Sequence, residues 1–200
     1  MGRQTVIFFG RPGAGKSTQF QLLAEYMAQA SPEPLLPFRW SPMIRAFIQG
    51  DTFAQRHAKE LVDAGELLPA FLAPSIWLPQ LLTTFTGKEH LLVDGLPRLM
   101  IEAELLVSAM EFYNRAPVAI INLEIPADVA QARLVERGKT EGKKKDMELG
   151  TIQKRLAWFE TEILPILEFL SNQPHYRLYS IDGTGSQHEV HKAIKTSLGI

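Results

Sequence analysis

A glycine-rich segment at residues 10–17, GRPGAGKS, interrupts an apolar pattern near the beginning of the chain. It follows the apolar run TVIFFG and precedes QFQLLAEYM, whose apolar residues recur with the period of a helix. The segment matches the pattern G-x-x-x-x-G-K-[ST] in the strand, loop and helix context that this pattern requires. Glycines let the main chain approach a ligand closely, so that backbone N–H groups and the positive end of the helix dipole can surround phosphate oxygens. We therefore predict a phosphate-binding loop, in preference to a glycine-rich turn that binds nothing.

The loop also predicts roles for the side chains that follow its last glycine. Lys16 is expected to reach the β- and γ-phosphates of ATP, and the Ser17 hydroxyl is expected to face Mg²⁺. Asp94 closes the apolar run in LLVDG, and we expect it to hold Mg²⁺ directly or through water, the alternative being a turn aspartate before glycine. The loop residues predicted to bind ATP are Gly10, Pro12, Gly13, Ala14, Gly15, Lys16, Ser17 and Thr18.

Apolar runs alternate with helical patterns along the rest of the chain. The runs at 5–10, 90–95, 118–125 and 176–183 are typical of buried parallel strands, and the proline-containing run at 34–41 suits an edge strand. Helical spacing predicts helices at 17–29, 43–49, 53–64, 70–85, 101–113, 127–137, 148–171 and 187–197. This alternation predicts an α/β fold, a parallel five-stranded sheet of the P-loop NTPase type flanked by helices.

Length and composition limit the number of domains and the kind of partner. Two hundred residues that are 46% apolar suit a single domain, and a formal net charge of -1 does not favour nucleic acid as a partner. There is no cysteine and no apolar run of about 18 residues, the length that a membrane span needs. We expect a soluble, cytoplasmic and monomeric protein that binds small molecules. Within the single domain 1–200, we expect a core of 1–40, 86–137 and 148–200, a helical insertion at 41–85 and a short glycine- and lysine-rich loop at 138–147.

Six segments occur in the order in which a known protein family has them. They are GRPGAGKSTQ, VDAGELLP, LLVDGLPRLMIEAELL, RLVERGKTEGKKKDM, TIQKRLAWFETEILPIL and IDGTGSQHEV. On these segments the chain resembles the adenylate kinase-like nucleoside monophosphate kinases over nearly its whole length. The resemblance implies reversible phosphoryl transfer from ATP, with Mg²⁺, to a monophosphate, which we expect to be AMP. It also implies that 41–85 binds the monophosphate and that 138–147 is a lid. The alternatives are a kinase for GMP, CMP or UMP, another small-molecule P-loop kinase, or a catalytically weak nucleotide-binding relative.

The resemblance also implies individual site residues. Arg133, Gly183 and Thr184 are expected near the ATP base, and Arg137 and Arg155 near the transferring phosphates, where guanidinium groups can match the charge on phosphoryl oxygens. The residues expected to bind the monophosphate are Ser41, Arg45, Glu66, Leu67, Leu68, Gly95, Arg98, Glu102 and Arg155. Those expected to take part in catalysis are Lys16, Asp94, Arg98, Arg137 and Arg155.

Three positions depart from the usual pattern of that family. Lys143 or Lys144 stands where the lid usually has an arginine, and only Asp146 remains of a pair of aspartates. The segment 40–43, WSPM, replaces a Thr-Gly-Asp stretch near the monophosphate base, and we expect Trp40 to be a core residue. Glu102 stands where adenylate-specific members have a glutamine that reads adenine. Since an ionised carboxylate only accepts hydrogen bonds, we expect Glu102 to weaken the discrimination for adenine, unless its carboxyl group is protonated or turned away from the base.

Overall fold

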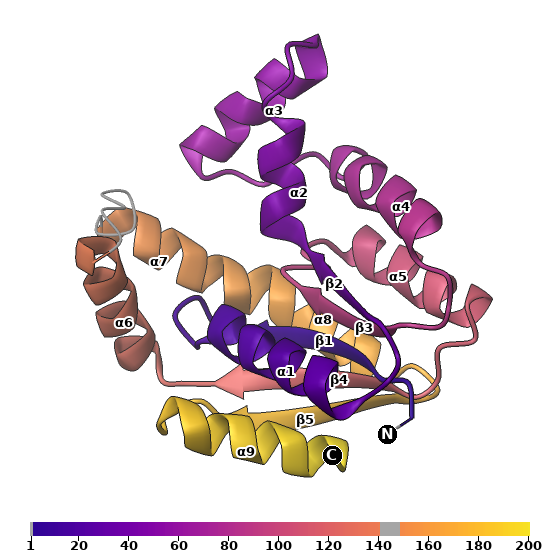
Figure 1. Cartoon of the computed structure of the whole chain (residues 1–200). Helices are drawn as coiled ribbons and strands as arrows, with labels where there is room; N and C mark the ends of the chain where they lie inside the picture. The colour runs from indigo at the N-terminus through magenta and orange to yellow at the C-terminus, as the bar shows by residue number, and fades with distance from the viewer. Residues whose placement is uncertain (1, 141–148) are drawn as a thin grey trace.

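The computed structural model describes residues 2–140 and 149–200, and its centre is a sheet of five parallel strands (Figure 1). The strands are β1 (Thr5–Gly10), β2 (Leu35–Arg39), β3 (His90–Asp94), β4 (Val118–Glu124) and β5 (Tyr176–Asp182). Their order in the sheet is β2-β3-β1-β4-β5, which places the proline-containing β2 at an edge, as predicted. The predicted P-loop α/β fold is confirmed.

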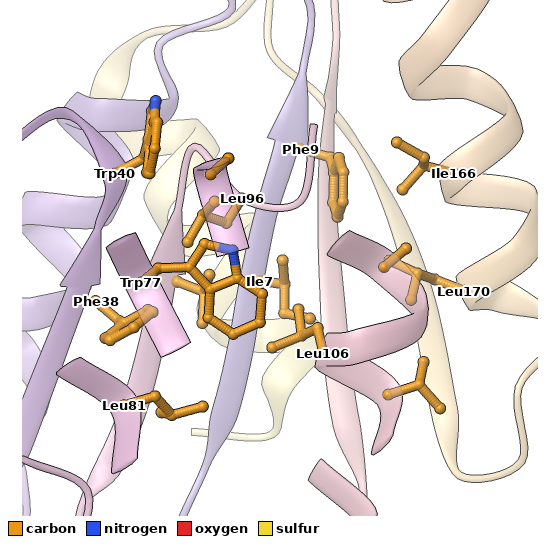
Figure 2. Close-up of a cluster of buried hydrophobic side chains, with 14 of the residues drawn as sticks. Ile7, Phe9, Phe38, Trp40, Trp77, Leu81, Leu96, Leu106, Ile166 and Leu170 are labelled. Atoms are coloured by element: carbon orange, nitrogen blue, oxygen red, sulfur yellow. The ribbon is translucent and has the colours of Figure 1, made fainter. Parts of the chain in front are cut away.

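Two hydrophobic layers cover the sheet because successive residues of a strand point to opposite faces. In β1, Val6 and Phe8 face the layer of α1 (Lys16–Ala30) and α9 (Gln187–Leu198). Ile7 and Phe9 face the opposite layer, where α4 (Leu72–Thr84), α5 (Met100–Phe112) and α8 (Leu164–Ser171) contribute Trp77, Leu106 and other apolar side chains (Figure 2). The β1 strand is therefore buried on both faces, and the loop that follows it starts from a fixed position.

The remaining helices stand around the carboxyl ends of the strands (Figure 1). They are α2 (Trp40–Phe47), α3 (Phe53–Ala64), α6 (Ala127–Thr140) and α7 (Leu149–Trp158). Helix α3 has a regular end at each side, with a capping box between Thr52 and Gln55 and a left-handed Gly65 at φ 72°. Helix α4 also lies within 41–85. Its Trp77 and Leu81 belong to the main core, as do Trp40, Met43 and Ile44 of α2, and α3 lies farthest from the sheet (Figure 1). Lys143, Lys144 and Asp146, which were predicted to belong to a lid, lie outside the described residues.

The helical segment predicted over 148–171 contains a π-helical turn in its middle. Between α7 and α8 the residues Phe159–Ile163 form a π-helical turn, in which the N–H of Leu164 bonds to the carbonyl of Phe159. Pro165 follows at the beginning of α8 and has no N–H to donate to the preceding turn. A wider turn before this proline keeps the chain helical without that donor. Among the described residues, no helix is both long enough and apolar enough to cross a membrane.

Candidate active site

The segment at residues 10–17 forms a tight loop between β1 and α1 that depends on its glycines. Gly10 has φ 142° and Gly13 has φ 89°, values that other residues rarely adopt. A Cβ atom on Gly10 would lie 2.5 Å from the carbonyl oxygen of Leu123, and one on Gly13 would lie 2.8 Å from that of Ala130. The two glycines therefore let the loop pack directly against β4 and α6, while helix α1 begins at Lys16.

Lys16 folds its ammonium group back over this loop. The Nζ atom donates hydrogen bonds to the carbonyl oxygens of Gly10 at 2.6 Å and Arg11 at 3.1 Å. Burial lowers the pKa of Lys16 from the ordinary 10.5 to about 8, Asp94 opposes this change, and the charges of Arg98 and Arg137 add to it. The ammonium is thus held among other cations, where a polyphosphate would relieve the repulsion between them.

Asp94 lies at the end of β3, opposite the beginning of α1. The Ser17 hydroxyl lies 3.4 Å from its Oδ2 atom, and the Nε atom of Arg39 lies 3.6 Å from the same oxygen. A carboxylate and a hydroxyl are the hard oxygen ligands that Mg²⁺ prefers, so these two residues fit the predicted metal. Mg²⁺ usually takes its remaining ligands from water and phosphates.

Arg39 is a site residue that the sequence interpretation missed. It ends β2, pairs in register with Asp94 of β3, and places its guanidinium 5.0 Å from the centre of the Phe20 ring. A basic residue at the carboxyl end of a predicted strand was the available signal. To infer the contact with Asp94 from that signal, the sequence would also have had to show that β2 and β3 are neighbours in the sheet.

Arg98 lies in the turn between β3 and α5 and is held by aromatic rings. Its guanidinium lies 6.0 Å from the Trp40 ring and 5.9 Å from the Trp158 ring, and its Nε atom donates to the carbonyl of Gly95 at 3.0 Å. Burial lowers the pKa of Arg98, an effect that nearby carboxylates oppose and the charge of Arg155 increases. Arg155, on α7, therefore lies close enough to act on the same site.

The structure brings the five predicted catalytic residues together from separate elements. The charges of Asp94, Arg98 and Arg137 change the pKa of Lys16. Those of Asp94 and Arg155 change the pKa of Arg98. Positive charges outnumber negative ones in this group. It can bind phosphate groups and stabilise negative charge on them.

The residues predicted near the ATP base also lie together. Arg133 extends from α6 to the loop before α9, where it donates to the carbonyl oxygens of Gly183 at 2.9 Å and Thr184 at 3.3 Å. Arg133 and Arg137 are one helical turn apart, so α6 connects this loop with the phosphate loop.

Known proteins resemble this chain over nearly its whole length. Residues 8–175 match the family model of adenylate kinase. Adenylate kinase 1 of Nostoc sp. is 30% identical over 97% of this chain and 98% of its own length. The adenylate kinase of Bacteroides thetaiotaomicron is 29% identical over 90% of each chain. The chain belongs to the adenylate kinase family. The predicted family and the predicted class of enzyme, a nucleoside monophosphate kinase, are confirmed.

In this adenylate kinase family member, the residues expected to bind the monophosphate differ in how far their side chains are exposed. Ser41, Arg45 and Glu66 have exposed side chains, whereas Leu67 is half-buried and Leu68 is buried. Trp40 and Met43 are core residues with 4% and 7% of their surface exposed, which confirms the interpretation of Trp40.

Glu102 does not present its carboxylate to an open site. Only 1% of its surface is exposed. Its Oε2 atom accepts the backbone N–H groups of Arg98 at 2.8 Å and Leu99 at 2.9 Å, and its Oε1 atom accepts from Trp77 Nε1 at 3.2 Å. Burial raises the pKa of Glu102, while these hydrogen bonds and the charge of Arg98 oppose the change. Both carboxylate oxygens of Glu102 therefore accept hydrogen bonds from within the protein.

Arg11, inside the phosphate loop, is a second residue that the sequence interpretation missed. Its guanidinium donates to the carbonyl of Ile125 at 2.9 Å and pairs with Glu160 at 2.5 Å. Since Glu160 belongs to the π-helical turn, this pair joins the loop to the helical segment that follows α7. A cavity of about 780 Å³ lies beside Arg11 and extends to Asp182 and Thr184. A charge between two loop glycines was the only signal of this contact in the sequence.

Proposed function

We propose that this protein is an adenylate kinase that transfers a phosphoryl group reversibly from ATP to AMP, giving two molecules of ADP. The observation that carries the proposal is the convergence of Lys16, Arg98, Arg137 and Arg155 with Asp94 at a glycine-rich phosphate loop. The choice of AMP is supported by the names of the related proteins. Both relatives given above are named adenylate kinases, and each aligns with 90% or more of this chain.

On the donor side, the loop and helix α1 hold the phosphates of ATP. Backbone N–H groups of residues 10–18 surround the phosphate oxygens, and Lys16 leaves the carbonyls of Gly10 and Arg11 to contact the phosphate being transferred. Arg133 and the carbonyls of Gly183 and Thr184 lie where the base is expected. Ser17 and Asp94 would hold Mg²⁺, which neutralises charge on the phosphates when it is bound.

On the acceptor side, guanidinium groups position the monophosphate. Arg98 is held in place before any ligand arrives, so it loses little conformational entropy when it binds a phosphate. Arg137 and Arg155 add donors for the equatorial oxygens of the group in transfer. No side chain has to become phosphorylated, and catalysis depends on position and charge neutralisation.

We also propose the moving parts of the enzyme. Residues 41–85, which include the exposed Ser41, Arg45 and Glu66, form the monophosphate-binding insertion, and residues 138–147 form a short lid. Closure of both parts would exclude water that would otherwise hydrolyse ATP. The enzyme is proposed to act as a monomer.

A coupled assay with ATP and each of AMP, GMP, CMP and UMP tests the proposal. We expect AMP to be the preferred acceptor and Lys16→Ala to abolish transfer while the protein remains folded by circular dichroism. A preference for another monophosphate would refute the choice of AMP. Absence of transfer to all four monophosphates would refute the proposed activity and would favour a protein that binds nucleotides without transferring phosphate. Near-normal turnover by the Lys16→Ala variant would refute the role of the phosphate loop.

A further inference from the structure

The carboxylate of Glu102 is surrounded by donors from two different parts of the fold. Glu102 is the third residue of α5, and its Oε2 atom accepts the N–H groups of Arg98 and Leu99 at 2.8 and 2.9 Å. Its Oε1 atom accepts from the indole of Trp77, which lies on α4 with 1% of its surface exposed, at 3.2 Å. Since Leu99 has no side-chain acceptor, Glu102 supplies the polar half of a capping box at the beginning of α5.

This arrangement fixes Arg98 at both ends. Glu102 holds its backbone N–H, while the carbonyl of Gly95 and the rings of Trp40 and Trp158 hold its guanidinium. A shift of the turn at 95–99 would move the guanidinium with it, because the main chain and the side chain of Arg98 are both part of that turn. The position of the Arg98 guanidinium in the active site therefore depends on the buried carboxylate of Glu102.

An ionised carboxylate suits this position better than an amide. Three N–H groups point at the two oxygens of Glu102, and a carboxylate accepts on both. A glutamine at the same place would turn its NH₂ group toward either the Trp77 indole or the two backbone N–H groups. At least one buried donor would then lack an acceptor: the indole in the first case, and both backbone N–H groups in the second.

We propose that Glu102 is a positioning residue that holds the turn at 95–99, and with it Arg98, in the geometry that binds the acceptor phosphate, and that it does not read the base. The inference rests on the proposed function of Arg98 as a monophosphate-binding residue. Selection of the base then depends on other residues of the acceptor side.

Steady-state kinetics of the full-length enzyme with ATP and AMP, GMP or CMP test the inference. Glu102→Gln is expected to lower kcat/KM for AMP by roughly tenfold, to leave the KM for ATP nearly unchanged, and to leave the AMP to GMP and AMP to CMP ratios unchanged. Glu104→Gln, an exposed position on the same helix, is the matched control and should behave as the wild type. An altered base ratio for Glu102→Gln, or wild-type kinetics, would overturn the inference.

Two double variants separate positioning from general destabilisation. In an Arg98→Ala background, Glu102→Gln should cause no further loss, since Glu102 acts through Arg98; a full additional loss would refute this route. Trp77→Phe removes the donor that faces the amide, so Trp77→Phe combined with Glu102→Gln should recover part of the activity lost in Glu102→Gln. A combined variant no better than Glu102→Gln would count against the hydrogen-bond account.

Amide hydrogen exchange of the wild-type protein gives a readout that does not depend on activity or on the folding of a variant. The N–H groups of Arg98 and Leu99 should exchange slowly, because both donate to the buried carboxylate of Glu102. Fast exchange in the wild type would overturn the proposed role of Glu102. If the enzyme transfers phosphate to none of the monophosphates, the proposed function fails, while the exchange result still decides whether Glu102 holds the turn.

Discussion

The lowered pKa of Lys16 predicts how the stability of this protein depends on pH. Folding takes the ammonium from water into a site beside Arg98 and Arg137, and its pKa falls from 10.5 to about 8. At about 1.4 kcal/mol for each pKa unit, the folded state is destabilised by about 3 kcal/mol when the group is charged. Because the folded pKa is the lower one, the full penalty applies below pH 8 and disappears as the pH rises toward 10.5.

Replacement of Lys16 by methionine removes this titration, so the difference between the two proteins isolates it. Urea unfolding at a series of pH values should show the unfolding free energy of the wild type rising relative to Lys16→Met by about 2.5 kcal/mol between pH 7 and pH 10. Other titrating groups are common to both proteins and cancel in the difference. Lys59→Met, which removes an ammonium from a side chain that is 54% exposed, is the matched control.

Parallel stability curves for the wild type and Lys16→Met would show that the ammonium is not destabilised by folding, and the electrostatic account of the loop would be wrong. A second measurement tests the same pKa in catalysis. Since the uncharged amine binds phosphate poorly, kcat/KM for ATP should fall above about pH 8. A value of kcat/KM that stays constant to pH 10 would contradict the pKa.

Two further predictions concern the same loop and the metal site. Arg39→Gln should lower the Mg²⁺ concentration for half-maximal rate by roughly two- to fivefold, since loss of a partly exposed ion pair worth up to about 1 kcal/mol frees Asp94. An unchanged or higher requirement in a Mg²⁺ titration, with the exposed Arg177→Gln as control, would contradict this. Gly10→Ala should lower the unfolding free energy by roughly 2–4 kcal/mol, because its Cβ would meet the Leu123 carbonyl at a strained φ. If Gly10→Ala unfolds in urea with the free energy of the wild type, glycine is not required at position 10.

The sequence by itself determined the features that depend on local pattern. Alternation of apolar runs and helical spacing predicted the five strands and most helices, and the prolines of 34–41 predicted an edge strand. The phosphate loop was equally readable, because its glycines, lysine and serine act through main-chain geometry within a few residues. Wherever the physical cause lies within one element or one turn, the sequence was sufficient.

The tertiary structure decided which side chains meet across elements. Arg39 reaches Asp94 because β2 and β3 are neighbours in register, and Arg11 reaches Glu160 across 149 positions of the chain. The same holds for Glu102, whose place in the sequence suggested a contact with the base. In the folded chain its oxygens accept hydrogen bonds from two backbone N–H groups and from an indole of α4. The direction of a carboxylate is set by the donors that folding leaves unpaired around it, and those donors come from segments whose proximity no local pattern records.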